Sequence, residues 1–425
     1  MRITYFANAM IMLEGKQSRV LCDPWVTFDR QSSSGLFTFP ELRMSREEVA
    51  ALAPHFIYLS HTHADHFDPT TLALFPSSTP VLIAKYAHNF TERNVRALGF
   101  NDVRIVDSIN GQALNGDDWC WIEPNAIYPE VDSLLVVRID GKTAVNLNDN
   151  PFDQAQCESL ARRFGQMDLA CVPFSFQGPY PAFYENLSAE ERAAEAEKKK
   201  LHNFETMTRF AETLKARRFF PFAAGALYAG PKARLFPYYG VGTCSEAIAY
   251  AQKRVKIESL LLSQRCSYDF ASGESSGTYR ETTYADQLEY IEAVARTPSI
   301  FDAGGRFWIA PSERIDLTKL LQRARQRQIG WQKRRQYVSD TAFFLDVGDD
   351  ALYRLCLSDD SVTRVIEAEI KDPVFEIFRI PYSLLMGVLT GHYNWSNIKT
   401  QHVSFFRKPN IFDPDLHILM SYLQL

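Results

Sequence analysis

Three histidines and an aspartate lie within six residues of the sequence, in the pattern H-x-H-x-D-H at positions 61–66. Side chains two residues apart in an extended chain point to the same side, so His61 and His63 can bind one metal ion together. Asp65 and His66 follow directly and are placed for a second ion. A polar loop that is rich in histidine by chance is the simpler alternative, but this spacing favours a metal centre.

The element that must position this motif is the apolar run before it. Residues 56–60, Phe-Ile-Tyr-Leu-Ser, have the length and the composition of a buried strand. The motif is therefore expected in the loop that leaves this strand, where a rigid scaffold fixes the side chains and leaves them accessible. An earlier predicted strand ends at Asp23, beside Pro24, and we expect this carboxylate to support the histidine loop.

A second strand end supplies further carboxylates. Residues 134–147 predict a β-hairpin around a D-G turn, and Asp149 follows its end. Asp149 leaves its strand as Asp65 leaves the earlier one, so it can bridge two ions. Two more acidic residues, Glu130 and Asp132, stand just ahead of the hairpin.

The composition is typical of a globular protein with a small-molecule substrate. The chain has 425 residues, 46% of them hydrophobic, and a formal net charge of −5. It can bury a large core, and neither its charge nor any basic stripe indicates a nucleic-acid partner. Its first residues predict a strand and no signal peptide or membrane span, so we expect a cytoplasmic protein. The seven cysteines are scattered without a C-x-x-C pair, which indicates reduced thiols.

Two regions differ in their pattern. Short apolar runs alternate with helical segments in the first part, and we expect residues 1–245 to form a catalytic domain. Residues 246–425 begin with helical stretches and then alternate into strands, which predicts a C-terminal α+β region packed on that domain. No function follows from this second region.

The metal motif resembles that of the metallo-β-lactamase superfamily, whose fold is an αββα sandwich of two mixed sheets with helices outside. The resemblance implies an α+β protein with this sandwich and a C-terminal extension. Within the superfamily, the chain resembles the catalytic part of the CMP-N-acetylneuraminic acid hydroxylases and related sugar-nucleotide hydroxylases. The segments that carry this second resemblance are residues 23–25, 56–67, 128–132, 148–149, 198–203 and 220–223, and more faintly 394–397 and 407–409.

The chain departs from the related enzymes in its expected metal ligands. Zinc hydrolases of the superfamily place a histidine ahead of the hairpin, where this chain has Tyr128, and a last metal histidine after the strand that ends near residue 222, where this chain has alanines. We expect Glu130 to replace the first histidine, with Asp132 as the second choice or as a supporting residue. The hydroxylases also carry a Rieske iron–sulfur domain, and this sequence has no Rieske pattern, so a separate electron-transfer protein is the expected electron source.

The resemblance implies a dinuclear metal enzyme, with two main alternatives for its reaction. In the first, a hydroxylase, two irons activate O2 with electrons from an external donor. In the second, a hydrolase, Zn²⁺ or Mn²⁺ lowers the pKa of a bound water to near 7 for attack on an ester, amide or phosphodiester. A carboxylate in place of an imidazole suits iron, so the oxygenase is favoured, with a polar, sugar-nucleotide-like substrate.

The expected ligands are His61, His63, Asp65, His66, Glu130 and Asp149, of which Asp65 and Asp149 are also expected to be catalytic. A metal fold that only binds a partner is the weakest alternative.

Four residues are candidates for substrate contacts. His88 lies just beyond a predicted strand and can face the cleft, and Tyr128 stands near the expected carboxylate ligand. A lysine run at 198–200 leads to His202 and Asn203 and can present cations to a phosphate. An ordinary surface or helix position is the simpler interpretation for a lone histidine or a charged run.

Overall fold

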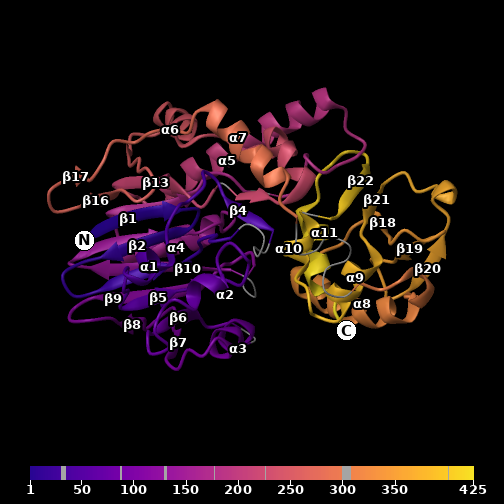
Figure 1. Ribbon diagram of the computed structural model, residues 1–425, viewed down its shortest axis with the longest axis horizontal. Helices are drawn as coiled ribbons and strands as arrows, with labels where there is room; N and C mark the ends of the chain where they lie inside the picture. Colours follow the sequence, from indigo (N-terminus) through magenta and orange to yellow (C-terminus); the bar gives the residue numbers. More distant parts are fainter. Residues whose placement is uncertain are drawn as a thin grey trace.

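The computed structural model describes residues 1–29, 35–86, 89–128, 132–176, 178–224, 226–298, 308–400 and 402–425. A larger unit with two stacked sheets lies at the left of Figure 1, and a smaller C-terminal unit lies at the right. The N-terminus lies in the larger unit and the C-terminus in the smaller one.

The first sheet of the larger unit changes from antiparallel to parallel along its width. Strands β1, β2 and β3 form an antiparallel meander, whereas β3, β5, β6 and β7 run parallel. Parallel neighbours require crossover connections, which place helices on the outer face of the sheet. In sheet order the strands are β17 (Glu274–Ser275), β16 (Ser267–Asp269), β1 (Arg2–Ala7), β2 (Met10–Glu14), β3 (Arg19–Cys22), β5 (Phe56–Tyr58), β6 (Val81–Ala84) and β7 (Val103–Val106).

The second sheet contains the predicted hairpin at its centre. Its turn residues Asp140 and Gly141 both have positive φ, 48° and 72°, as a two-residue D-G hairpin turn requires. Beyond the hairpin the strands run parallel. In sheet order they are β15 (Glu258–Ser259), β13 (Arg218–Phe222), β12 (Leu169–Pro173), β11 (Lys142–Asn146), β10 (Ser133–Ile139), β9 (Trp119–Pro124) and β8 (Gln112–Ala113).

Three hydrophobic layers hold this unit together as an αββα sandwich. Residues such as Val20 and Leu135, one from each sheet, are fully buried in one cluster between the sheets. The outer face of the first sheet packs on helices α1 (Arg46–Ala50), α2 (Pro69–Leu72) and α3 (Phe90–Ala97). The outer face of the second packs on α4 (Gln154–Phe164), α5 (Ala189–Thr213) and α6 (Cys244–Gln252).

The sandwich continues past the predicted domain boundary at residue 245. That boundary falls inside α6. Of the later strands, β15 pairs with β13, β16 pairs with β1, and β17 extends the first sheet beyond β16. The sandwich is completed near its edge by a small pair of strands, β4 (Leu36–Thr38) and β14 (Ala226–Tyr228), with the 3-10 helix η1 (Gly230–Tyr238) and helix α7 (Tyr284–Ala295). Short edge strands carry too few residues for their own sequence signal, which explains the difference.

The C-terminal unit is an α+β layer built on one sheet. Its strands in sheet order are β20 (Val362–Val365), β19 (Leu352–Leu355), β18 (Ala342–Asp346), β21 (Phe375–Arg379) and β22 (Ser404–Lys408). Its helices are η3 (Pro311–Glu313), α8 (Thr318–Arg335), η4 (Glu367–Glu369), α9 (Tyr382–Leu389), α10 (Trp395–Lys399), α11 (Pro414–Leu419) and η5 (Met420–Tyr422).

One hydrophobic cluster joins the two units. It includes Trp25, Tyr180 and Tyr228 from the sandwich and Phe378 and Trp395 from the C-terminal unit, all of them buried. Helix α10 lies on the side of the C-terminal unit that faces the sandwich (Figure 1). The C-terminal unit and the sandwich therefore share one apolar contact surface.

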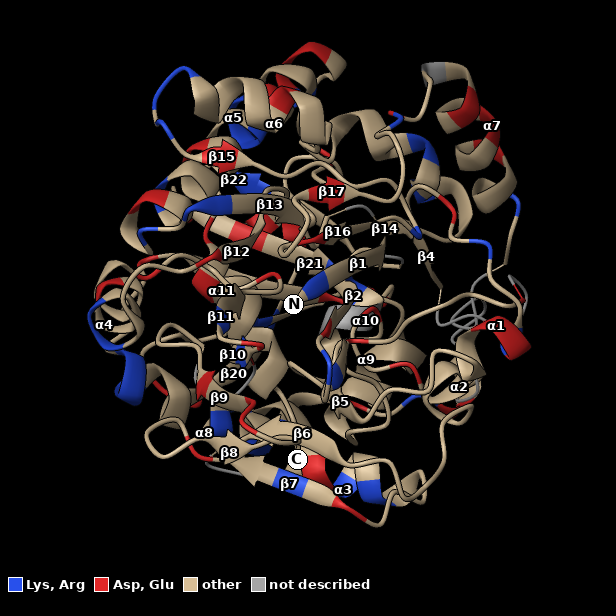
Figure 2. Cartoon of the chain, turned by 90° about the vertical axis from the view of Figure 1, so that its left-hand side faces the viewer, with Lys and Arg blue, Asp and Glu red and all other residues tan. Residues whose placement is uncertain are grey.

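The described residues contain no membrane-crossing helix, and the side of the molecule in Figure 2 carries charges of both signs. No helix of the described residues is long and apolar enough to cross a bilayer. Lysine and arginine alternate with aspartate and glutamate over the elements in Figure 2.

Candidate metal centre

The ends of two parallel strands bring the first support residue to the histidine loop. Cys22 of β3 lies opposite Tyr58 of β5, so both strands end at the same edge of the sheet. The amide and the hydroxyl of Ser60 donate to the two carboxylate oxygens of Asp23, at 2.8 and 2.7 Å. Asp23 has a φ of 42°, a left-handed conformation that aspartate adopts more readily than most residues. Asp23 thus lies where the sequence predicts a support for the loop.

His66 is buried, with a different partner on each ring nitrogen. Its Nδ1 lies 2.8 Å from Asp23 Oδ2. Its Nε2 lies 3.6 Å from Asp65 Oδ2 and 3.6 Å from Asp149 Oδ1. A carboxylate on Nδ1 holds a proton there, so Nε2 is the nitrogen that can bind a metal ion once it has lost its own proton.

His61 repeats this arrangement. Its Nδ1 lies 2.9 Å from Ser60 Oγ and 3.3 Å from Asp132 Oδ1. Because the single hydroxyl hydrogen of Ser60 is donated to Asp23, Ser60 Oγ can only accept from His61, so we infer a proton on His61 Nδ1. His61 Nε2 is then free, and it faces Nδ1 of His63 at 2.7 Å.

Asp149 lies between the two histidines. Its Oδ1 is 3.9 Å from His61 Nε2 and 3.6 Å from His66 Nε2. It follows β11 through Asn148, which has a φ of 50° and donates from Nδ2 to the Ser133 carbonyl at 2.7 Å. This is the position that a carboxylate shared by two ions needs.

Asp65 is held on the opposite side by a residue from the first hairpin. The Nδ2 of Asn8 donates to Asp65 Oδ2 at 3.2 Å and lies 3.4 Å from the Asp65 carbonyl oxygen. Asn8 itself is buried in the turn between β1 and β2, with a φ of 48°. Asp65 is therefore oriented by the sandwich and is not a mobile loop residue.

Burial disfavours the charged form of all three histidines, but neighbouring carboxylates reverse the outcome for His66. Burial, with the nearby His66, holds the pKa of His61 well below its usual value, and burial with His61 lowers the pKa of His63 to about 3. Burial also disfavours a charged His66, but Asp149, Asp65 and Asp23 outweigh it and raise the pKa of His66 to about 10. Two neutral imidazoles beside a cluster of carboxylates form an environment that attracts a cation.

The polar atoms of this cluster fit metal ions. Asp132 Oδ1 and Asp149 Oδ1 are buried and accept no hydrogen bond in the described structure. Two groups of possible ligands gather within 4.8 Å, one of His61, His63 and Asp132 and one of His61, His66 and Asp149. Buried acceptors without donors are costly unless a cation satisfies them. Asp132 contacts Nδ1 of His61 and not the Nε2 that faces His63, which favours the supporting role, although Asp132 also lies within ligand distance of His63.

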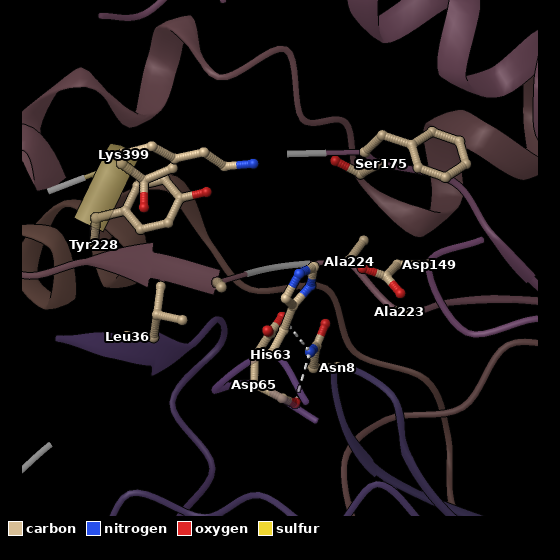
Figure 3. Close-up of a pocket in the computed structure, with 13 residues that line it drawn as sticks. Asn8, Leu36, His63, Asp65, Asp149, Ser175, Ala223, Ala224, Tyr228 and Lys399 are labelled. Atoms are coloured by element: carbon tan, nitrogen blue, oxygen red, sulfur yellow. Dashed lines mark hydrogen bonds between the residues drawn. The ribbon is translucent and has the colours of Figure 1, made fainter. Parts of the chain in front are cut away.

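A cavity opens from the cluster toward the C-terminal unit. His63, Asp65 and Asp149 line it at one end, and Tyr228 and Lys399 line it at the other (Figure 3). Its volume is about 170 Å³. The alanines after β13 also line it, so no imidazole from the described residues of that strand end reaches the cluster.

The residues predicted to contact substrate lie elsewhere or outside the described parts. His202 is exposed on α5, and Asn203 is buried with its Nδ2 3.4 Å from the Gly240 carbonyl oxygen. Tyr128 does not line the cavity, although it lies close enough to Asp132 for that carboxylate to help raise the pKa of its phenol, after burial and Asp415. These positions give no support to the predicted substrate contacts. His88 and Glu130 lie outside the described residues, so their predicted roles stay predictions.

Several residues of the site carry no signal in the sequence. Ser60 and Asn8 orient the histidine loop, but a serine ending a strand and an asparagine in a turn are common. Tyr228 and Lys399 reach the cavity from segments far from the motif. The one available signal for Ser60 is its position directly before H-x-H-x-D-H, where a hydroxyl can reach the histidine rings.

No protein-family model matches the chain. A protein of Mycolicibacterium smegmatis, provisionally named a Rieske 2Fe-2S iron–sulfur protein, is 31% identical over 194 residues, which cover 44% of this chain and 36% of that one. The human inactive cytidine monophosphate-N-acetylneuraminic acid hydroxylase is 26% identical over 235 residues, covering 52% of this chain and 44% of that one. The chain thus spans less than half the length of these two relatives.

A shorter relative and two solved structures were also found. A UPF0173 metal-dependent hydrolase of Bacillus velezensis is 22% identical over 184 residues, covering 41% of this chain and 72% of that one. The structure of a possible metal-dependent hydrolase from Veillonella parvula covers 63% of this chain and 98% of its own, with 14% identity and a TM-score of 0.46. That of CmlA, a diiron β-hydroxylase from Streptomyces venezuelae, covers 61% and 52%, with 14% identity and a TM-score of 0.40.

The αββα layers, the motif at the end of β5 and the sequence relatives together confirm the predicted metallo-β-lactamase fold. The predicted relationship to the CMP-N-acetylneuraminic acid hydroxylases is confirmed by the human relative and by one from Danio rerio, 30% identical over 155 residues. The chain therefore has this fold with a candidate metal centre, and its sequence relatives include both hydroxylases and metal-dependent hydrolases.

Proposed function

We propose that the protein is a dinuclear, non-haem diiron hydroxylase that acts on a polar small molecule, with sugar nucleotides as the leading substrate class. The observation that carries this proposal is the acidic ligand set, in which Asp65 and Asp149 face His61 and His66, while the end of β13 offers alanines. A ligand set that contains several carboxylates suits iron, whereas a set made mainly of imidazoles suits zinc. The similarity to the named hydroxylases supports the same assignment.

In this proposal His61 and His63 would hold one ion and Asp65 and His66 the other, with Asp149 shared between them and Glu130 as the remaining expected ligand. Bound iron supplies the capacity to reduce O2, with electrons from an external donor that we propose to be a separate electron-transfer protein. The chain's own residues fix the geometry. Asp23 and Ser60 orient the two buried imidazoles, and Asn8 orients Asp65. These contacts hold the ligands in place before substrate arrives.

Metal analysis of aerobically purified protein, followed by O2-uptake measurements with a chemical reductant, tests the proposal. We expect about two irons per chain, and O2 uptake that is lost when a chelator removes them. Two equivalents of zinc with no O2 uptake after reconstitution with Fe²⁺ would refute it.

A metallo-hydrolase is the second candidate function. The specific observation in its favour is the similarity to a UPF0173 metal-dependent hydrolase, which spans most of that shorter protein. With Zn²⁺ or Mn²⁺ bound, the site would supply a hydroxide at neutral pH, and Asp65 or Asp149 would orient it for attack on an ester, amide or phosphodiester. Hydrolysis of 4-nitrophenyl acetate or bis(4-nitrophenyl) phosphate by the zinc-loaded protein, lost in His63→Ala, would favour this function.

A further inference from the structure

We propose that Lys399 of the C-terminal unit binds an acidic group of the substrate, so that the site takes an anion held between the metal centre and helix α10. This inference deepens the proposed function and rests on it only in placing the substrate in this cavity. It assigns a specificity role to the C-terminal unit, which the sequence left without function.

The position of Lys399 supports this role. Lys399 is the last residue of α10 and lines the cavity together with His63, Asp65 and Asp149. Figure 3 shows its ammonium group directed into the cavity, on the opposite side from the metal-binding residues. A substrate that reaches the ions must therefore pass within range of this charge.

The rest of α10 fixes Lys399 in this position. Trp395 is 1% exposed and stacks on Phe378 of β21, with ring centroids 5.5 Å apart and an interplanar angle of 3°. Ile398 is fully buried in the same cluster. Because the helix is anchored by large apolar contacts, the lysine is held at the cavity and does not simply extend into solvent.

Lys399 has no direct partner in the described structure. Its Nζ forms no hydrogen bond and no ion pair with any described residue, although Asp149, Asp132 and Asp65 are near enough to oppose the lowering of its pKa by burial. Lys399 is half-buried, so its ammonium is accessible from the cavity and can pair with an anion that binds there.

The alternative is that Lys399 only balances the charge of the carboxylates. Metal ions would neutralise those same carboxylates, since Asp65 and Asp149 become ligands when the ions bind. The ammonium would then face a site of net positive charge and would need an anion of its own. A structural counter-ion would also be expected to form a direct ion pair, which Lys399 does not form with the described residues.

A second lysine adds positive potential on the same side. Lys199 of α5 is close enough to Lys399 that their charges repel, and its Nζ donates to the Tyr180 carbonyl at 2.9 Å. Burial, with Lys399 as the next cause, lowers the pKa of Lys199 to about 7. An anion beside Lys399 would relieve this repulsion.

The test is calorimetric titration of the full-length, metal-loaded protein with inorganic phosphate and, separately, with acetate. The variants are Lys399→Met, Lys399→Arg and the control Lys371→Met, which removes an exposed lysine of the same unit. Phosphate and acetate distinguish a phosphoryl group from a carboxylate. Any direct binding to the metal ions is common to all variants, so the difference between them reports on Lys399.

We expect Lys399→Met to weaken binding of one or both anions about 10- to 100-fold, as for the loss of a hydrogen bond to a charged group, while Lys399→Arg stays within a few fold of the wild type. Lys371→Met should bind as the wild type does, and metal content should be equal in all four proteins. Lys399→Gln replaces Lys399→Met if the latter fails to fold.

Three results would overturn the inference: equal affinity of Lys399→Met and wild type, no binding of either anion by the wild type, or loss of metal from Lys399→Met. The last would make Lys399 a structural counter-ion. Because the titration involves no turnover, it stands apart from the oxygenase assignment. A zinc-loaded protein without O2 uptake would refute the proposed function and still report on anion binding.

Discussion

His61 and His66 each have one ring nitrogen toward protein carboxylates and one toward the cavity side. Asp23 and Ser60 occupy the protein side, so Nε2 of each ring is already directed at the site, and on His66 a metal ion would displace the Nε2 proton that the nearby carboxylates stabilise. His63 has no such carboxylate partner among the contacts described, and it is the histidine that lines the cavity. Removing His63 should therefore disturb metal binding more than the surrounding packing.

We predict that His63→Ala abolishes tight metal binding and activity while the protein stays folded. The side chain is partly exposed and the core is built from the flanking strands, so the loss of stability without metal should be small. Metal content by elemental analysis and the circular dichroism spectrum check both parts. His202→Ala, on the exposed face of α5, is the matched control and should keep its metal. Full metal occupancy in His63→Ala would show that the motif is not the binding site.

The two acidic residues ahead of the hairpin separate the proposed reactions. If Glu130 is a ligand in place of histidine, Glu130→His should raise zinc retention relative to iron and suppress O2-dependent turnover, because imidazole suits zinc. Asp132→Asn should instead leave the identity of the bound metal unchanged and weaken the affinity for it about 10- to 100-fold, as expected for a residue that orients His61. Elemental analysis of both variants is the measurement. An Asp132→Asn protein that loses one ion completely, beside a Glu130→His protein that is unchanged, would make Asp132 the ligand.

At the scale of elements, local signals predicted the strands and turns that surround the candidate site. The apolar run before the motif is β5, the D-G turn closes the β10–β11 hairpin, and Asp23 and Asp149 follow strand ends as expected. Each of these signals lies within a few residues of what it predicts. Lys399 could not be predicted, because a lone lysine more than 300 positions from the motif reaches the cavity only through the packing of α10 on β21. The sandwich extends past residue 245 because β16 pairs with β1 in the first sheet. No local pattern indicates a pairing between segments so far apart in the sequence.

The junction between the units contains a buried charged network. Arg407 Nη1 donates to Glu376 Oε2, Tyr184 Oη of the sandwich donates to Glu376 Oε1 at 2.7 Å, and His417 Nε2 lies 3.5 Å from the same oxygen. Glu376 is fully buried. Burial favours the neutral acid, but His417, Arg407 and Tyr184 outweigh it and lower the pKa of Glu376. This network fixes β21 and β22 against the segment that precedes α5.

We predict that Glu376→Gln destabilises the protein by about 3–5 kcal/mol, because it leaves Arg407 buried without a counter-ion. Asp372→Asn, which breaks the more exposed Arg354 ion pair at 2.8 Å in the same unit, should cost less than about 1 kcal/mol. Urea unfolding of both variants measures the difference. The pKa of Glu376 is lowered in the folded state, so its contribution to the free energy of unfolding is present above the unfolded pKa of about 4.5 and is lost as the pH falls below that value. The stabilities of the two variants should therefore converge in acid. A difference that persists unchanged at low pH would argue against the charged network.

At the scale of the whole molecule, two units of different architecture share one cavity. The sandwich supplies the metal-binding residues, and the C-terminal unit supplies Lys399 and a large apolar contact surface. Motion between the units would change the distance between the proposed anion site and the proposed ions. In the two proposals together, the C-terminal unit recognises the substrate through Lys399 and the sandwich transforms it at the metal centre.

The last prediction concerns the source of electrons. Hydroxylation by O2 consumes two electrons beyond those of the substrate's C–H bond, and in the described parts of this chain no group of potential metal ligands contains cysteine. Burial raises the pKa of the thiols of Cys22, Cys120 and Cys171, which makes them poor electron donors or ligands. We therefore expect iron-loaded protein to consume O2 catalytically only when a reductant is added, and faster with a reduced ferredoxin-type protein than with dithiothreitol. An oxygen electrode measures the rate, with His63→Ala as the inactive control. Sustained O2 uptake without any added donor would contradict the need for an external electron-transfer partner.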